Sequence, residues 1–286
     1  MPTRDARVGN KAYKSVNLLI VGFGDSPNHP GEIRGGSRCG RLAATSLVRN
    51  FEGIMAAAAA FLNPTCESPS RDEVLARYRR LREIGAMHCS RATAFLSADA
   101  VLRQSRRLGL DRDGSLDGHE LTMALDLAIY AAPVGCSRAI DRYAKSAQHA
   151  PGSDEALVLE AMRNARFAVV SVQRRHPAAG LIVTDLFRKA ELWLVNCGFE
   201  ISLPEHSVFA TRYFAPEVFA MTTGADIPVD VDLLRSAFGS MPQLLRRSPN
   251  EAIEHWRLPE VVHRTAIAHR VTETTIYKEL FSGQLG

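Results

Sequence analysis

Residues 167–176, FAVVSVQRRH, open the part of the chain that decides the fold. Four further segments rich in β-branched and aromatic residues follow: GLIVTDLF (180–187), AELWLVNCGF (190–199), VFATRYF (208–214) and VFAMTTGADIPV (218–229). Turn residues such as His176 with Pro177 and Arg188 with Lys189 separate them. Short strands joined by tight turns pair with their neighbours in antiparallel order. The pattern therefore predicts an antiparallel β meander or small barrel of at least four strands over residues 167–229.

Alternation along these strands predicts which residues are buried, because successive side chains point to opposite faces of a sheet. We expect five apolar residues to lie mostly in the core: Val170, Val183, Leu192, Leu194 and Phe209. Trp193 lies between two of them and is expected to face the opposite side. Four polar residues of the module stand among apolar neighbours: Asp185, Glu191, Arg212 and Asp226. These four could line a small polar site, but alternation predicts that most of them face solvent.

Residues 70–166 carry the signals of helices. SRDE at 70–73 is a capping box, in which the Ser70 hydroxyl accepts from the amide of Glu73 and the Glu73 carboxylate reaches back. Asp117 and Glu120 form a second box. Apolar periodicity predicts further helices at 92–108, 118–131 and 137–147, and one that opens at residue 152.

Helical periodicity returns after the strands. Asp230 is the expected N-cap of VDLLRSAFGSM (231–241), and a further helix is expected at 249–268. Residues 1–69 are rich in Gly, Pro, Ser and Asn and show no sustained period. The sequence thus predicts an α+β fold in four parts: a poorly structured segment (1–69), a helical region (70–166), the antiparallel β module (167–229) and a C-terminal helical region (230–286).

Composition indicates a soluble globular protein. The 286 residues are 46% hydrophobic and 23% charged, and the formal net charge of +4 permits an acidic partner without requiring one. The five cysteines are widely spaced with no C-x-x-C pair, which indicates reduced thiols. The apolar stretches at 16–23 and 53–62 are far shorter than the roughly 20 residues of a membrane span. We therefore expect a cytoplasmic protein with no membrane contact.

LDRDGSLDGHEL (110–121) resembles the calcium loop of an EF-hand, with three aspartates as candidate ligands: Asp111, Asp113 and Asp117. That loop needs a glycine at its sixth position and a bidentate glutamate at its twelfth, where this chain has Leu116 and Thr122. We expect no calcium site here, and the sequence indicates no other metal and no cofactor.

Other motifs do not identify an enzyme. HELTM (119–123) has Met123 where the helix of a zinc protease needs its second histidine. LLIVGFG (18–24) begins like a dinucleotide-binding turn, but Pro27 stands at the third glycine position. Three histidines of the C-terminal region are expected on helix surfaces: His255, His263 and His269. No catalytic residue is assigned.

AIAHRVTETTIYKEL (266–280) has the spacing of a helix-turn-helix and resembles the recognition segment of tetracycline-repressor-type regulators and site-specific recombinases. If it binds DNA, the contacts would come from Arg270, Thr274, Thr275, Tyr277 and Lys278. However, Arg270 stands where the turn glycine belongs, and the β-branched residues that follow oppose a recognition helix. We favour packing or a terminal strand, with Val271 and Ile276 buried against the body.

A longer resemblance covers roughly residues 74–270. The segments that carry it are GSDEALVLEAMRNARFAVVSV, GLIVTDLFRKAELWLVNCGF and FATRYFAPEVFAMTTGADIPV, preceded by LDLAIY and AIDRYAKSA. They resemble a widespread family of uncharacterised bacterial proteins. The resemblance implies no settled activity, so no site residue is transferred from it.

Taken together, these patterns favour a non-enzymatic binding or interaction protein of unknown partner, which could be another protein or a second copy of the chain. The first alternative is a DNA-binding regulator that uses residues 266–280. The second alternative is an enzyme with a site in the β module. A deep pocket that joins Asp185, Glu191 or Arg212 would favour the enzyme.

Overall fold

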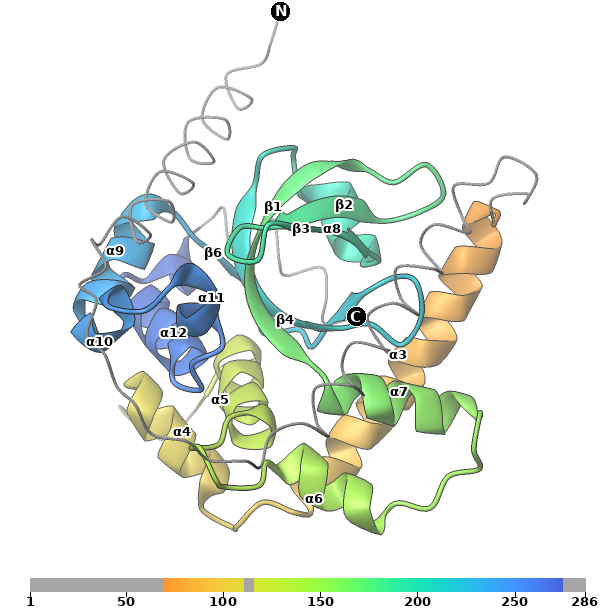
Figure 1. The fold of residues 1–286 in the computed structure, drawn as a ribbon, viewed down its shortest axis with the longest axis horizontal. Helices are drawn as coiled ribbons and strands as arrows, with labels where there is room; N and C mark the ends of the chain where they lie inside the picture. The colour runs from red at the N-terminus through yellow and green to blue at the C-terminus, as the bar shows by residue number, and fades with distance from the viewer. Residues whose placement is uncertain (1–68, 111–115, 275–286) are drawn as a thin grey trace, which may run out of the picture.

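The computed structural model describes residues 69–110 and 116–274. In this part of the chain, helices stand before and after one antiparallel sheet, which confirms the predicted α+β fold (Figure 1). The helices before the sheet are α3 (Arg71–Thr93), α4 (Ala100–Leu108), α5 (Gly118–Tyr130), α6 (Ala139–Ser146) and α7 (Asp154–Arg163). The short α8 (Cys197–Ser202) lies within the β region. The helices that follow are α9 (Val231–Gly239), α10 (Pro242–Leu245), α11 (Pro249–Ile253) and α12 (Leu258–Ala268), then the 3-10 helix η1 (Val271–Glu273).

The sheet has the antiparallel pairing that the strand pattern predicts. Its strands are β1 (Arg166–Arg175), β2 (Leu181–Asp185), β3 (Ala190–Leu194), β4 (Val208–Phe214), β5 (Met221–Thr222) and β6 (Ile227–Pro228). Their order is β3-β2-β1-β4-β5, and β6 also pairs with β4. The prediction of at least four antiparallel strands is therefore confirmed.

The sheet curls until its two ends meet. The amide of Val195, just after β3, donates to the carbonyl of Ala220 at 2.9 Å, and the amide of Ala220 donates to the carbonyl of Trp193 at 2.7 Å. Gly180 lies close against the backbone of β3 near this closure. Its φ is +80°, and a Cβ at this position would meet the carbonyl oxygen of Leu194 and lie 2.9 Å from the Cα of Val195.

Alternation predicts burial inside the curl correctly for four of the five residues expected there. Val170, Val183, Leu194 and Phe209 are buried there together with Phe199 of α8, and Leu192 is half-buried against the same cluster. Trp193 packs on the opposite face, as expected, where its indole nitrogen donates to the carbonyl of Ala179 at 2.7 Å.

Helices cover the outside of the sheet, so its outward side chains are buried as well. One apolar cluster joins Phe167 and Val169 of β1 to α4, α5 and the helices α9 to α12. A second cluster joins Phe214 of β4 and Met221 of β5 to α3, α6 and α7. In Figure 1 the helices α9 to α12 lie on one side of the sheet and α3 lies on the opposite side.

The structure confirms both capping boxes but corrects two predicted helices. The Ser70 and Asp117 boxes begin α3 and α5. The predicted helix at 92–108 is wrong at its start, because α3 continues to Thr93, with Ala92 fully buried, and α4 begins only at Ala100. The predicted helix at 249–268 is two helices. Pro259 stands in the first turn of α12, where a proline starts a helix because no amide partner is needed there.

No helix among the described residues is long and apolar enough to cross a membrane.

Candidate functional site

Three of the four polar residues of the β module are buried, although most of the four are expected to face solvent. Asp185, Arg212 and Asp226 are buried, with exposed fractions of 0%, 6% and 2%, and only Glu191 is exposed. The prediction is wrong for three residues because both faces of this sheet are buried. Helices cover the outer face, which carries Arg212, and the curl encloses the inner face, which carries Asp185 and Asp226. The structure does not bring the four together into one pocket of the kind expected for an enzyme. Each buried residue has its own partners.

Asp185 holds a turn. Its Oδ1 accepts from the amides of Phe187 and Arg188, both at 3.0 Å, and its Oδ2 lies 2.6 Å from Nη1 of Arg188. These contacts close the β2–β3 connection, in which Lys189 takes a left-handed φ of 57°. The carboxylate is thus occupied by the chain itself.

Arg212 joins the sheet to α5. Its Nε donates to both carboxylate oxygens of Asp126 at 3.0 Å, and its guanidinium lies over the ring of Tyr130, 5.1 Å from the centroid. The hydroxyl of Thr223 also donates to Asp126, at 2.9 Å. The Nη2 of Arg212 has no hydrogen-bond partner among the described residues. This buried pair fixes α5 against β4.

Asp226 and His263 are buried near the ion pair of Asp126 and Arg212. The hydroxyls of Thr211 and Thr222 donate to the Asp226 carboxylate, the second at 3.3 Å, and burial raises its pKa to about 6. Burial lowers the pKa of His263 to about 4, and neither ring nitrogen has a partner in the described part of the chain. The prediction that His263 lies on a helix surface is wrong, because the buried face of α12 packs on the sheet.

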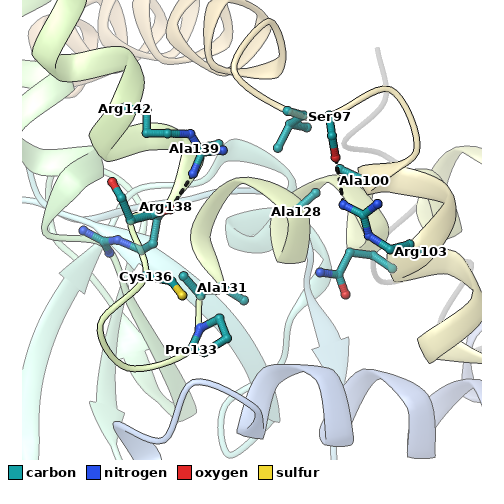
Figure 2. A pocket seen from close by; sticks show the side chains of 14 residues that line it. Ser97, Ala100, Arg103, Ala128, Ala131, Pro133, Cys136, Arg138, Ala139 and Arg142 are labelled. Carbon is teal, nitrogen blue, oxygen red and sulfur yellow. Dashed lines mark hydrogen bonds between the residues drawn. The ribbon is translucent and has the colours of Figure 1, made fainter.

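A pocket of about 200 Å³ lies elsewhere, between α4, the C-terminal end of α5, the 131–138 loop and α6 (Figure 2). Small side chains form one part of its lining: Ala100, Ala128, Ala131, Ala132, Pro133 and Ala139. Three arginines form another part: Arg103, Arg138 and Arg142. The small side chains leave the space open, and the arginines give the pocket positive charge.

Two of the three arginines are neutralised locally. Nε and Nη2 of Arg138 donate to the carboxylate of Asp141 at 2.7 and 2.9 Å. Arg103 pairs with Asp99 and also donates to the hydroxyl of Ser97 at 2.7 Å. Both guanidinium groups are held in place, and each has a carboxylate beside it.

Arg142 differs because its hydrogen-bond acceptors are uncharged. Its Nη1 donates to the carbonyl of Ser137, drawn as a dashed line in Figure 2, and its Nη2 donates to the carbonyl of Phe95 at 2.6 Å. It forms no ion pair with any residue that the structure describes. The two carbonyls fix the guanidinium without cancelling its charge. The first turn of α6 has no side-chain cap, and the one acidic residue in that turn is Asp141.

The calcium-loop candidates are only partly described. Asp117 accepts from the amides of His119 and Glu120, both at 2.8 Å, and so serves as the N-cap of α5. Asp111 and Asp113 lie outside the described residues. Among residues 69–110 and 116–274, no group of three or more His, Cys, Asp or Glu could hold a metal ion.

Of the residues predicted to contact DNA, only two are among the described residues. Arg270 ends α12 in a left-handed conformation with φ of 55°, and both it and Thr274 are exposed. Val271 is half-buried and packs against the cluster that contains α12. The remaining candidates, Thr275, Tyr277 and Lys278, lie outside the described residues, as does Ile276.

Sequence reasoning missed the arginine pocket. Arg103 and Arg142 are 39 positions apart in the sequence. Phe95, whose carbonyl accepts from Arg142, is 47 positions away from it. The signals that precede α6 are weak: a run of small residues at 131–136 and Arg138 at the helix start. Neither signal identifies a site, because the pocket forms only when α4 packs on α5.

The fold and the pocket define an α+β protein whose curled antiparallel sheet is covered by helices, with a cationic hollow among the helices that precede it. The chain belongs to a family of unknown function, DUF7986, whose model matches residues 72–236. The match extends from α3 into α9 and so includes the sheet and the pocket. No curated protein and no solved structure matches the chain.

Proposed function

We propose that this is a non-enzymatic binding protein and that the pocket between α4 and α6 takes a small anionic ligand. The observation that carries the proposal is Arg142, whose guanidinium is fixed by two backbone carbonyls and keeps its charge. A planar guanidinium can bind a carboxylate or a phosphate through two parallel hydrogen bonds. A side chain already held in position loses little conformational freedom when a ligand binds.

The charge balance around the pocket supports an anion. Three guanidinium groups line it, and two carboxylates, Asp99 and Asp141, pair with two of them. The two aspartates offset two of the three positive charges, so one positive charge remains. It lies on α6 itself, whose first turn has no side-chain cap and carries one acidic residue, Asp141, the partner of Arg138.

Isothermal titration of the full chain with inorganic phosphate and with acetate, at pH 7 and low salt, tests the proposal. We expect at least one of these anions to bind, with a dissociation constant on the order of 1 mM for such a small open site. Arg142→Gln should weaken binding about tenfold or more, equivalent to roughly 1.4 kcal/mol. Added salt should weaken it further.

Two control variants separate charge from folding. Arg235→Gln changes an exposed arginine on α9 that pairs with Asp232, and it should bind like the wild type. Arg142→Lys keeps the charge without the planar fork and should bind more weakly than the wild type but better than Arg142→Gln. Thermal unfolding of each variant checks that the fold is kept. If neither anion binds, or if Arg142→Gln binds as well as Arg235→Gln, the proposal is wrong.

A second candidate function is DNA binding by the C-terminal segment 266–280. It is favoured by the left-handed Arg270, which supplies the turn conformation for which a glycine was expected. A gel shift with duplex DNA at low salt, comparing the full chain with one that ends after Ala266, tests it. Retardation that the truncated chain loses supports this function, and equal mobility of the DNA with both chains excludes it.

A further inference from the structure

Building on the proposed anion site, we propose that its ligand is a monocarboxylate with a short aliphatic tail. The carboxylate would bind Arg142, and the tail would lie along the alanine side chains of α5 and the 131–138 loop. This inference names the class of ligand, and it depends on the proposed function.

The apolar part of the pocket lies between its two arginine-bearing sides. Figure 2 shows Ala128 and Ala131 between the side that carries Arg142 and the side that carries Arg103. The two alanines are half-buried. Methyl groups beside a fixed guanidinium can take methylene groups out of water while the charged head stays bound.

The size of the pocket limits the ligand. A hollow of about 200 Å³ is smaller than the roughly 300 to 1,000 Å³ of sites for drug-sized molecules. Pro133 and Val134 continue the apolar surface in the adjoining loop, and Val134 is 95% exposed. A tail of a few carbons would fill the hollow, and a longer one would extend past this loop.

The charge of the pocket favours a carboxylate over a phosphate. After the two ion pairs are subtracted, one positive charge remains for the ligand. A carboxylate carries one negative charge at pH 7, whereas a phosphate ester carries about 1.5 to 2. The second charge of a phosphate would have no counter-charge from the described residues of the pocket.

Isothermal titration of the full chain with acetate, butyrate, hexanoate and inorganic phosphate tests the inference. Each methylene that becomes buried should tighten binding about fourfold, until the tail leaves the hollow. Butyrate should bind more tightly than acetate and more tightly than phosphate. If binding does not depend on chain length, or if phosphate binds most tightly, the ligand class is wrong while the anion-binding function stands. If no anion binds, both proposals fail.

A filled pocket gives an independent test. Ala128→Leu places a larger apolar side chain on the wall, and leucine is a good helix former. We expect hexanoate to bind at least tenfold more weakly while acetate binding changes by less than about twofold. Ala150→Leu, at an exposed position outside the pocket, is the matched control, and thermal unfolding checks both variants. Equal losses for acetate and hexanoate, or no loss for hexanoate, would overturn the placement of the tail.

Discussion

At the residue scale, Asp226 and His263 are buried titratable groups whose pKa values shift in opposite directions. Burial raises the pKa of Asp226 to about 6, against partial compensation by Thr211, Arg82 and Thr222. Burial lowers the pKa of His263 to about 4. Both groups favour the neutral form in the folded state, so they change stability with opposite signs as the pH falls.

For Asp226, the folded protein binds the proton more tightly than the unfolded chain does. Its contribution to stability is therefore greatest at low pH and is lost as the pH rises from about 4 through 6. Asp226→Asn removes this dependence. Relative to the wild type, the free energy of unfolding of the variant should increase by about 3 kcal/mol between pH 4 and 7. Urea unfolding across this range measures the difference, and a flat difference would contradict the prediction.

For His263, the folded protein binds the proton less tightly than the unfolded chain does. Its contribution is lost as the pH falls from about 6.5 through 4. The stability of His263→Leu, measured against the wild type in the same urea series, should therefore rise by about 3 kcal/mol as the pH falls over that window. His269→Leu, at an exposed position, should show no such trend. The same trend in both variants would rule out burial as its cause.

Gly180 gives a third prediction at this scale. Gly180→Ala places a Cβ against the backbone at the closure of the sheet, and the φ of +80° is unfavourable for alanine. Gly152 also has a φ of +80°, but nothing lies within 4 Å of its added Cβ. We expect about 1 kcal/mol of destabilisation for Gly152→Ala, and at least about 2 kcal/mol for Gly180→Ala. Equal losses in denaturant unfolding would show that the contact with β3 does not matter.

At the element scale, the Asp126–Arg212 pair connects α5 with β4. Removing one partner leaves a buried charge, which typically costs about 3 to 5 kcal/mol. We expect Asp126→Leu and Arg212→Met each to lose stability of this order. The double variant should lose much less than the sum, because it leaves neither charge buried.

A double-mutant cycle in urea measures this coupling. The exposed pair Asp232–Arg235 on α9 is the control, with an expected coupling below about 1 kcal/mol. Additive losses at Asp126 and Arg212 would mean that the two side chains stabilise the fold independently.

At the scale of the whole molecule, burial is greater at the centre of the sheet than at β3. Every residue of β4 is buried, whereas β3 lies at the end of the strand order and begins with exposed residues. We expect the amides of β1 and β4 to exchange hydrogen only through global unfolding, and those of β3 to exchange faster through local opening. Hydrogen exchange followed by mass spectrometry measures both. Faster exchange in β4 than in β3 would place the stable centre elsewhere.

The sequence by itself determined the features that depend on neighbours along the chain. The capping boxes at Ser70 and Asp117 place two helix starts, since a cap and its helix are separated by three residues. Alternation places Val170 and Phe209 inside the sheet and Trp193 outside it, because a strand alternates its side chains whatever surrounds it. The α+β class follows from these local periods.

Only the tertiary structure decided which polar residues are buried and where a site forms. Arg212 and His263 are buried because helices that precede and follow the sheet in the sequence cover its outer face, and Asp226 is buried because the sheet curls around its inner face. No local period encodes either arrangement. Arg142 faces a pocket because α4 and α6 pack near the end of α5. Burial and convergence depend on contacts between residues far apart in sequence, which the pattern of one segment does not contain.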